Sequence, residues 1–263
     1  MTPVKIAADD LSALSGAGWY QVALDGFDLD FYFRPSETKR AFVFSPGWIN
    51  RSTYTHPYFQ RIKWFDQLDG VGISLADPLL GAHDDVQIGW FIGTRESDHS
   101  RVTAQFLASL LKHLGVPPAR TLFFGSSAGG FASLAFATHL RGAHAFAVNP
   151  QTNILRFHDT AELSKMTRAG FESADLIKIE RRFLARVNIA ALWKKEQYVP
   201  PTNLVVNTFD DWHMRNHIVP LIGSLATREL ASNVDLKFFS DSEAGHNPPG
   251  PGLLIPLLKK ALP

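Results

Sequence analysis

The sequence has no cysteine and no marked excess of charge of either sign. Without cysteine, disulfides, thiolate metal sites and a cysteine nucleophile are excluded. A formal net charge of +1 without a block of Lys and Arg makes nucleic acid and anionic membranes poor candidates as partners. No run approaches the roughly 20 apolar residues that span a bilayer. The N-terminal segment also lacks the basic and apolar regions of a secretory signal. We therefore expect a cytoplasmic protein without a membrane span, although a secreted chain without its signal would look similar.

The 263 residues have an ordinary globular composition, with 45% hydrophobic and 19% charged residues. This length favours one domain, residues 1–263, over two. The oligomeric state is not indicated by any of these features. The first strand signals form a hairpin, in which Gln21–Leu24 and Asp28–Phe33 flank the turn dipeptide Asp25-Gly26.

After the hairpin, short apolar runs alternate with longer helical stretches. The expected strands are Ala41–Phe44, Val71–Leu75, Thr121–Phe124, Ala143–Val148, Leu204–Val206 and Val234–Phe239. The expected helices are Val102–Leu114, Ala128–Leu140, His217–Leu230 and Leu253–Leu262. Short apolar strands are typical of parallel sheets buried on both faces. The pattern therefore predicts an α/β fold with a mostly parallel, eight-stranded sheet and helices on both faces.

Residues 151–200 form the one long interval without a strand signal. Apolar residues recur there at helical spacing, which predicts an amphipathic helix. They are Leu176, Ile179, Phe183, Val187 and Ala191. We expect this interval to be a helical insertion within the same domain.

A candidate nucleophile lies in Gly125-Ser126-Ser127-Ala128-Gly129, which fits the pattern G-x-S-x-G. The pentapeptide alone is weak evidence. Here, however, it follows the apolar strand Thr121–Phe124 and opens the helix-like AGGFASLAFATHL, and in this setting a serine is presented on a sharp turn. The alternative is a glycine-rich turn that only packs or binds phosphate, but no lysine follows the glycines and G-x-G-x-x-G is absent. The pattern favours Ser127 as a nucleophile.

The motif and the strand order resemble the α/β-hydrolase superfamily from Tyr20 onward. The resemblance implies a triad in the order serine, acid, histidine, with the acid after a late strand and the histidine after the last one. His246 fits the second position. Asp210 and Asp211 both fit the first, and Asp210 is preferred because Asn207 then occupies the glycine position found three residues before the acid in many members.

The same resemblance implies an oxyanion hole made of two backbone N–H groups. Ala128, directly after the nucleophile, and Trp48, in the loop Ser45-Pro46-Gly47-Trp48, are the candidate donors. Pro46 replaces the histidine that the superfamily often has there, so a plain turn remains the alternative for this loop.

Three further groups of residues have a functional and a structural interpretation. His213 and His217, with Asp210 nearby, have the spacing of a metal site, but a polar rim or a helix start is favoured. His83-Asp84-Asp85 is interpreted as a solvated loop rather than a metal cluster. We therefore expect no bound metal. Trp90 and Trp212 fall in segments near the expected site and are candidates for substrate binding, with core packing as the alternative.

Within the superfamily, GSSAGGFASLAFATHL followed by AFAVNPQTN resembles bacterial polysaccharide-biosynthesis proteins, including capsule O-acetyltransferases. This implies a carbohydrate hydroxyl as acceptor, acetyl-CoA as acyl donor, and a lid role for residues 151–200. No bound cofactor is expected. A carboxylesterase for a small-molecule ester would need the same residues with water as acceptor. A catalytically silent binding protein with this fold is the remaining alternative.

Overall fold

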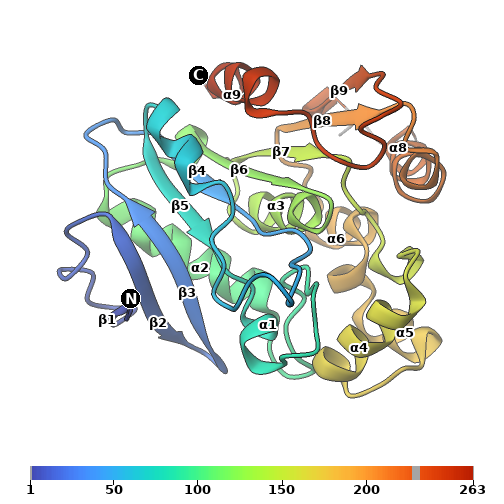
Figure 1. Cartoon of the computed structure of the whole chain (residues 1–263), viewed down its shortest axis with the longest axis horizontal. Helices are drawn as coiled ribbons and strands as arrows, with labels where there is room; N and C mark the ends of the chain where they lie inside the picture. The colour runs from blue at the N-terminus through green and yellow to red at the C-terminus, as the bar shows by residue number, and fades with distance from the viewer. Residues whose placement is uncertain (1, 227–231, 263) are drawn as a thin grey trace.

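A computed structural model of the chain describes residues 2–226 and 232–262. Within these residues, nine strands form a single sheet in the order β1-β2-β3-β5-β4-β6-β7-β8-β9 (Figure 1). The strands are β1 (Val4–Ile6), β2 (Gly18–Leu24), β3 (Phe27–Arg34), β4 (Ala41–Phe44), β5 (Val71–Leu75), β6 (Thr121–Ser126), β7 (His144–Val148), β8 (Thr202–Asn207) and β9 (Val234–Phe239).

All eight strands expected from the sequence are present, and the ninth is β1. It has only three residues, two of them exposed, so it is too short to show an alternating apolar pattern. The expected hairpin is confirmed, since β2 and β3 pair antiparallel with Leu24 opposite Phe27. From β5 to β9 every neighbouring pair is parallel. The carboxyl ends of these strands therefore lie along one edge of the sheet.

Helices connect the parallel strands. They are α1 (Pro78–Ala82), α2 (His99–His113), α3 (Ala128–His139), α4 (Thr160–Phe171), α5 (Leu176–Val187), α6 (Ile189–Glu196), α7 (Asp211–His213), α8 (Val219–Leu225) and α9 (Pro251–Lys260), with 3-10 turns η1 (Ile62–Gln67), η2 (Pro118–Arg120) and η3 (Ile154–Arg156) and a π turn η4 (Met214–Ile218). The helix expected to end at Leu230 reaches Leu225 as α8, and the positions from 227 to 230 fall outside the described residues. None of the described helices is both long and apolar enough to cross a bilayer.

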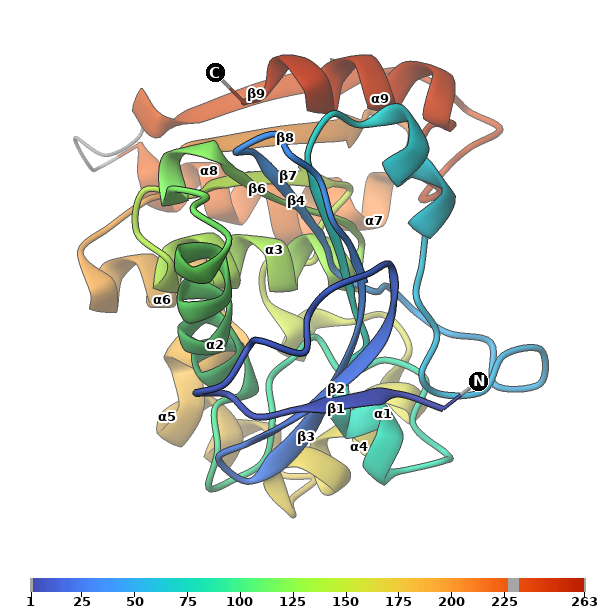
Figure 2. The ribbon, with the colours of Figure 1, turned by 90° about the vertical axis from the view of Figure 1, so that its left-hand side faces the viewer.

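The strands alternate their side chains between two separate cores, which is the period of two expected of a buried sheet. Val43 and Phe123 face the larger core, which also contains side chains of α2 and α3. Their chain neighbours Phe44 and Phe124 face the smaller core, together with residues of η1 and α9. Figure 2 shows α9 on the side of the sheet away from α2 and α3. Helices on both faces were expected from the strand composition, and this expectation is confirmed.

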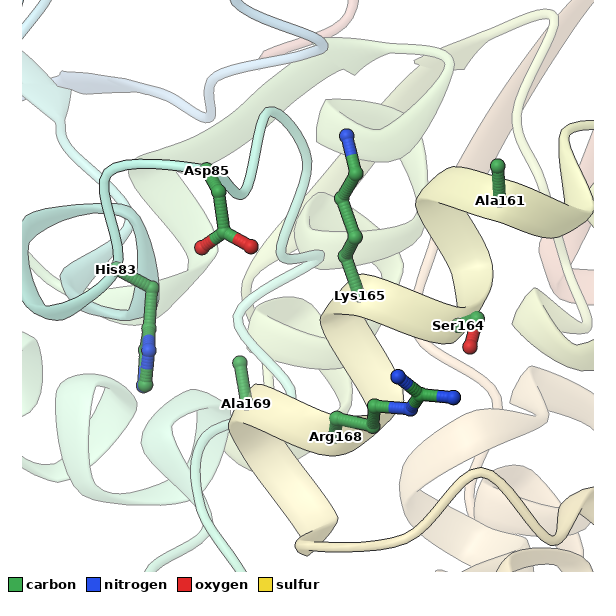
Figure 3. A pocket seen from close by; sticks show the side chains of 7 residues that line it. All are labelled: His83, Asp85, Ala161, Ser164, Lys165, Arg168 and Ala169. Atoms are coloured by element: carbon green, nitrogen blue, oxygen red, sulfur yellow. The ribbon is translucent and has the colours of Figure 1, made fainter.

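The interval between β7 and β8 contains η3 and the helices α4, α5 and α6. A single helix through Leu176 and Ala191 was expected there, and this is wrong. The helix ends at Val187, and the extended backbone of Asn188 (φ −143°) starts α6, with its side-chain oxygen accepting from the N–H of Ala191. One face of α4 forms a polar depression in which Lys165 and Arg168 lie near His83 and Asp85 (Figure 3).

Candidate active site

A cavity of about 560 Å³ lies at the edge of the sheet where the parallel strands end. Loops that follow different strands meet there, as is usual for sites in open α/β sheets. Its wall is formed by Gly47, Trp48, Gln60, Arg61, Ile88, Ser126, Ser127, Phe157, His158, Asp159, Glu162, His246, Asn247 and Pro248. The cavity thus brings together the candidate nucleophile Ser127 and the candidate base His246.

The backbone makes a sharp, strained turn at Ser127, with φ 56° and ψ −121°. Residues other than glycine rarely adopt this backbone conformation, and strain of this kind is concentrated at functional sites. The turn is possible only because its neighbours are small. A Cβ on Gly125 would lie 2.2 Å from the backbone of Gly129, one turn further on. The glycines of the pentapeptide are therefore needed to bring the strand end and the start of α3 together.

The loop after β4 packs directly on the first turn of α3. A Cβ on Gly129 would lie 2.5 Å from the carbonyl oxygen of Ser45. The loop is held at its other end by Gln60, whose side-chain oxygen accepts from the N–H of Gly47 at 3.2 Å. Trp48 is thereby placed on the cavity wall beside the start of α3, where the N–H of Ala128 lacks an intrahelical acceptor. The oxyanion role of these two residues remains a prediction.

Asp210 is buried and accepts hydrogen bonds from two histidines. Its Oδ2 lies 2.6 Å from Nδ1 of His246, and its Oδ1 lies 2.8 Å from Nδ1 of His213. Burial alone raises the pKa of the Asp210 carboxyl, but the hydrogen bonds from His213 and His246 outweigh burial and hold that pKa well below its ordinary value. The carboxylate is therefore ionised, and both histidines present a protonated Nδ1 to it. The neighbouring Asp211 is exposed and instead pairs with Arg215 at 2.7 Å.

The Ser127 hydroxyl is hydrogen-bonded to Gln151, a residue that was not predicted to be functional from the sequence. Trp90 donates its indole N–H to Oε1 of Gln151 at 3.1 Å, and because that group is only a donor it fixes the orientation of the amide. The amide nitrogen then donates to Oγ of Ser127 at 2.9 Å and to Nε2 of His213 at 2.8 Å. His213 is thus a neutral imidazole whose Nε2 is already occupied, in agreement with burial, which lowers its pKa.

Nε2 of His246, by contrast, has no hydrogen-bond partner within the described part of the chain. It is buried, while the residue as a whole lines the cavity. With Nδ1 protonated against Asp210, Nε2 carries a lone pair when the ring is neutral. His246 is therefore the one of the two histidines that is equipped to accept a proton from a group in the cavity.

Two buried asparagines hold the loop that carries His246. Asn207, at the end of β8, donates to the carbonyl oxygens of Asp241 at 2.7 Å and Gly245 at 2.8 Å. Asn149, at the end of β7, donates to the carbonyl oxygen of His246 at 3.1 Å. Asn207 was noted in the sequence only for its position three residues before Asp210, and Asn149 was not singled out. The loop after β9 is therefore fixed to two neighbouring strands.

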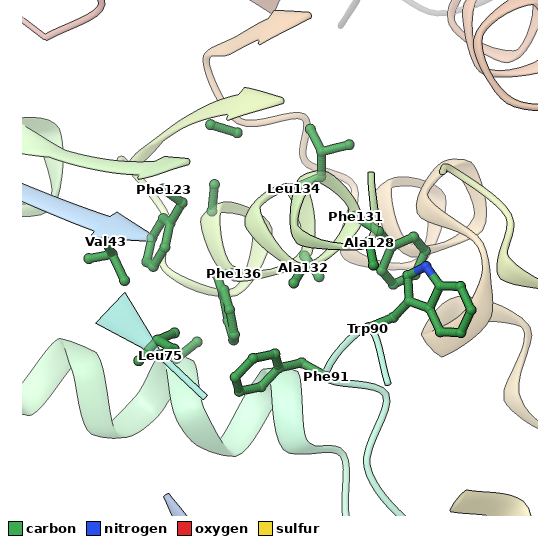
Figure 4. Packing of buried hydrophobic residues seen from close by; sticks show 14 of the residues in the cluster. Val43, Leu75, Trp90, Phe91, Phe123, Ala128, Phe131, Ala132, Leu134 and Phe136 are labelled. Carbon is green, nitrogen blue, oxygen red and sulfur yellow. The ribbon is translucent and has the colours of Figure 1, made fainter. Parts of the chain in front are cut away.

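The two tryptophans considered for substrate binding lie away from the cavity wall. Trp90 is only 1% exposed and packs near Phe131, beside the start of α3 (Figure 4). Its position is that of core packing, and it contacts the site through Gln151 and through Phe157, whose ring centroid lies 5.1 Å from its own. Trp212 is exposed, and its ring lies 6.3 Å from that of His158, which does line the cavity.

The polar-rim interpretation of His213 and His217 is wrong, because both side chains are buried, whereas the helix-start alternative agrees with the position of His213 in α7. His217 lies behind His213 and accepts from the N–H of Thr152 at 3.3 Å. Within residues 2–226 and 232–262, the one group with metal-ligand spacing is Asp210, His213 and His246. Both of its Nδ1 atoms and both carboxylate oxygens are already used in hydrogen bonds to one another. The His83 loop gives no such group within those residues.

No family model and no curated protein matches the sequence. Solved structures do match. Capsule O-acetyltransferase of Neisseria meningitidis serogroup A is 15% identical with a TM-score of 0.62, covering 86% of this chain and 87% of that one. An S-formylglutathione hydrolase from Agrobacterium tumefaciens is 13% identical with a TM-score of 0.61, and the match covers 93% of this chain and 91% of that one. A Glycosylation Associate Protein complex from Streptococcus agalactiae is 14% identical with a TM-score of 0.63, covering 85% of this chain and 42% of that one. The strand order, the turn at Ser127 and these likenesses together show that the chain has the α/β-hydrolase fold.

Proposed function

We propose that the protein is a serine-dependent acyl-transfer enzyme with Ser127 as nucleophile, His246 as general base and Asp210 as the acid that orients it. The observation that carries this proposal is the 2.6 Å contact between Asp210 and His246 on the wall of the cavity that also contains Ser127. The carboxylate fixes the tautomer of His246 and stabilises its protonated form.

The choice of His246 over His213 rests on the occupancy of their Nε2 atoms. Nε2 of His213 accepts from Gln151, so it offers no lone pair to the serine. Nε2 of His246 is without a partner among the described residues. Rotation of the Ser127 hydroxyl away from Gln151 would direct its proton toward the cavity. Substrate binding tightens catalytic hydrogen bonds of this kind in many enzymes.

In the proposed reaction Oγ of Ser127 attacks the carbonyl carbon of an ester or thioester while its proton passes to His246. The N–H groups of Ala128 and Trp48 bind the oxyanion of the tetrahedral intermediate. Collapse of the intermediate expels an alcohol or thiol, which takes the proton from His246. An incoming hydroxyl then attacks the acyl-enzyme while His246 removes its proton. Collapse of this second intermediate breaks the bond to Oγ of Ser127, which takes the proton back from His246 as the acyl product leaves.

We infer O-acetyl transfer to, or removal from, a carbohydrate hydroxyl as the specific reaction. The sequence around Ser127 and Asn149 resembles polysaccharide-biosynthesis acyltransferases, and a structural neighbour with a TM-score of 0.60 is a capsule O-acetyltransferase in complex with CoA. Acetyl-CoA is accordingly the proposed donor. Four residues at the start of the inserted helices line the cavity and would contact the acceptor as part of a lid: Phe157, His158, Asp159 and Glu162. Carboxylester hydrolysis, with water as acceptor, is the alternative.

The test is intact-mass analysis of the protein after mixing with acetyl-CoA and, separately, with 4-nitrophenyl acetate. We expect an increase corresponding to one acetyl group from acetyl-CoA, located on Ser127 by peptide mapping. Ser127→Ala should give no adduct, whereas the control Ser109→Ala, at an exposed serine of α2, should still be acetylated.

Rapid turnover of the ester with no response to acetyl-CoA would favour the esterase alternative. Failure of both reagents to acylate Ser127 would contradict the proposed mechanism and leave a binding protein as the better description.

A further inference from the structure

A cationic side chain, that of Arg61, lines the cavity beside the nucleophile. Arg61 directly precedes η1 and has a left-handed backbone, with φ 61°. Its guanidinium donates to Oγ of Ser126 at 2.8 Å and to the side-chain oxygen of Gln60 at 3.1 Å. Ser126 is the chain neighbour of Ser127, so the positive charge lies close to the position of the proposed acyl-enzyme.

No carboxylate pairs with Arg61 among the residues that the structure describes. Instead, its guanidinium carbon lies 5.6 Å from the ring centroids of both Trp64 and Phe124. Loss of solvent lowers the pKa of Arg61 to about 10, so the side chain remains charged at neutral pH. A charge withdrawn from water without a counter-ion is unfavourable, and proteins tolerate it mainly where a ligand supplies the opposite charge.

The comparison with two other partly buried arginines shows that Arg61 is different. Arg51 donates to the carbonyl oxygens of three residues, and Arg186 likewise donates to three. The N–H groups of Arg51 and Arg186 thus hold neighbouring loop segments together. Arg61 uses two of the five N–H donors of a guanidinium in the described structure, which leaves the others for a ligand or solvent.

Among the described residues, neither of the two carboxylates on the cavity wall, Asp159 and Glu162, forms an ion pair with Arg61. Asp159 accepts from the backbone N–H groups of Ala161 and Glu162 at the start of α4. Oε1 of Glu162 pairs with Lys165, whereas its Oε2 has no hydrogen-bond partner within the described residues. Arg61 also borders an adjacent hollow in which the rings of Tyr54 and Tyr58 stack 4.0 Å apart. An extended substrate could pass from this hollow to Ser127 beside the guanidinium.

We propose that Arg61 binds an oxyanion, a phosphate or a carboxylate, on the substrate that acylates or deacylates Ser127. This inference rests on the proposed acyl transfer and names its substrate class, an anionic donor or acceptor. Arg61 is here a binding residue that takes no part in proton transfer. The planar guanidinium, with donors on one edge, suits the geometry of both kinds of oxyanion.

Inorganic phosphate is the first probe, at constant ionic strength maintained with chloride. We expect phosphate to inhibit hydrolysis of 4-nitrophenyl acetate competitively and to raise the unfolding midpoint of the Ser127→Ala protein. Arg61→Met should weaken the inhibition roughly tenfold or more, Arg61→Lys should retain part of it, and Arg181→Met, at an exposed arginine of α5, should leave it unchanged.

The source of the oxyanion is distinguished with two thioesters. If Arg61→Met raises KM for acetyl-CoA but not for S-acetyl-N-acetylcysteamine, which lacks phosphates, the anion belongs to the donor. If KM for both thioesters stays constant while discrimination between acidic and neutral sugar acceptors is lost, it belongs to the acceptor.

The alternative is that Arg61 only supports the loop of Trp48 through Gln60. In that case Arg61→Met would slow the neutral and the anionic substrates equally, and phosphate would neither inhibit nor stabilise the unsubstituted protein. Either result would overturn the inference. It would leave the proposed function intact as long as ester turnover still requires Ser127, whereas turnover that persists in Ser127→Ala would overturn the proposed function itself.

Discussion

The rings of His213 and His246 stack with their centroids 3.7 Å apart and their planes at 16°, and each donates to a different oxygen of Asp210. The two imidazoles share one carboxylate, but only one of them lines the cavity. In the proposed mechanism the two rings therefore have different tasks: His246 transfers the proton, and His213 orients Asp210 and Gln151.

Substitution of the two histidines should separate these tasks. We expect His246→Gln to reduce kcat by roughly a thousandfold or more, as loss of a general base does in serine enzymes. His213→Gln should reduce it only about tenfold, the effect of one hydrogen bond to a charged group. Turnover of 4-nitrophenyl acetate measures both.

Urea unfolding of the two variants is the control that separates a catalytic loss from a loss of structure. Equal losses of kcat in two variants of similar stability would argue against the assignment of His246 as base.

The position of the loop that carries His246 should depend on the side chain of Asn207. Asn207→Ala removes the amide that binds the carbonyl oxygens of Asp241 and Gly245, and it leaves these two acceptors without that partner. We expect a loss of about 1–3 kcal/mol in the free energy of unfolding and a fall in kcat larger than the change in KM. Urea unfolding and steady-state kinetics test this. Asn203→Ala, on the same strand but paired with Lys237, is the control that should spare kcat.

Close contact between α3 and the loop after β4 predicts a specific effect of a single methyl group. In Gly129→Ala the new Cβ would lie 2.5 Å from the carbonyl oxygen of Ser45, so the loop must move away from the helix. We expect at least a hundredfold loss of kcat, because the oxyanion donors would no longer converge. Gly223→Ala in α8, where nothing lies within 4 Å, should keep full activity and gain slightly in stability. Full activity in Gly129→Ala would contradict the oxyanion role of this loop.

The sequence predicted those parts of the site that depend on local pattern and strand order. Ser127 lies on a turn whose small neighbours are adjacent in the chain, and the places of Asp210 and His246 follow from the order of the strands. Gln151 and Asn149 could not be found in this way, because their roles depend on side chains that meet only in the folded protein. Trp90 shows the same limit: an aromatic residue near the expected edge of the sheet has no pattern that separates a core position from a cavity wall.

Burial of His217 should make the protein less stable as the pH falls through the range in which free histidine becomes protonated. Burial lowers the pKa of His217 to about 3 in the folded protein, against an ordinary value of 6.5. Between these pH values the unfolded chain binds a proton that the folded chain does not. The free energy of unfolding therefore rises with pH in this range and falls on acidification. The contribution of this one group is at most about 5 kcal/mol.

His217→Gln should reduce this acid sensitivity, because glutamine takes up no proton and can still accept from the N–H of Thr152. The measurement is the free energy of unfolding in urea at several pH values from 3.5 to 7.5 (approximately the range between the two pKa values and one unit beyond). The variant should be less stable than the unsubstituted protein at pH 7 and should lose less stability as the pH falls to 4. Parallel pH dependence in the two proteins would show that the buried imidazole does not control acid unfolding.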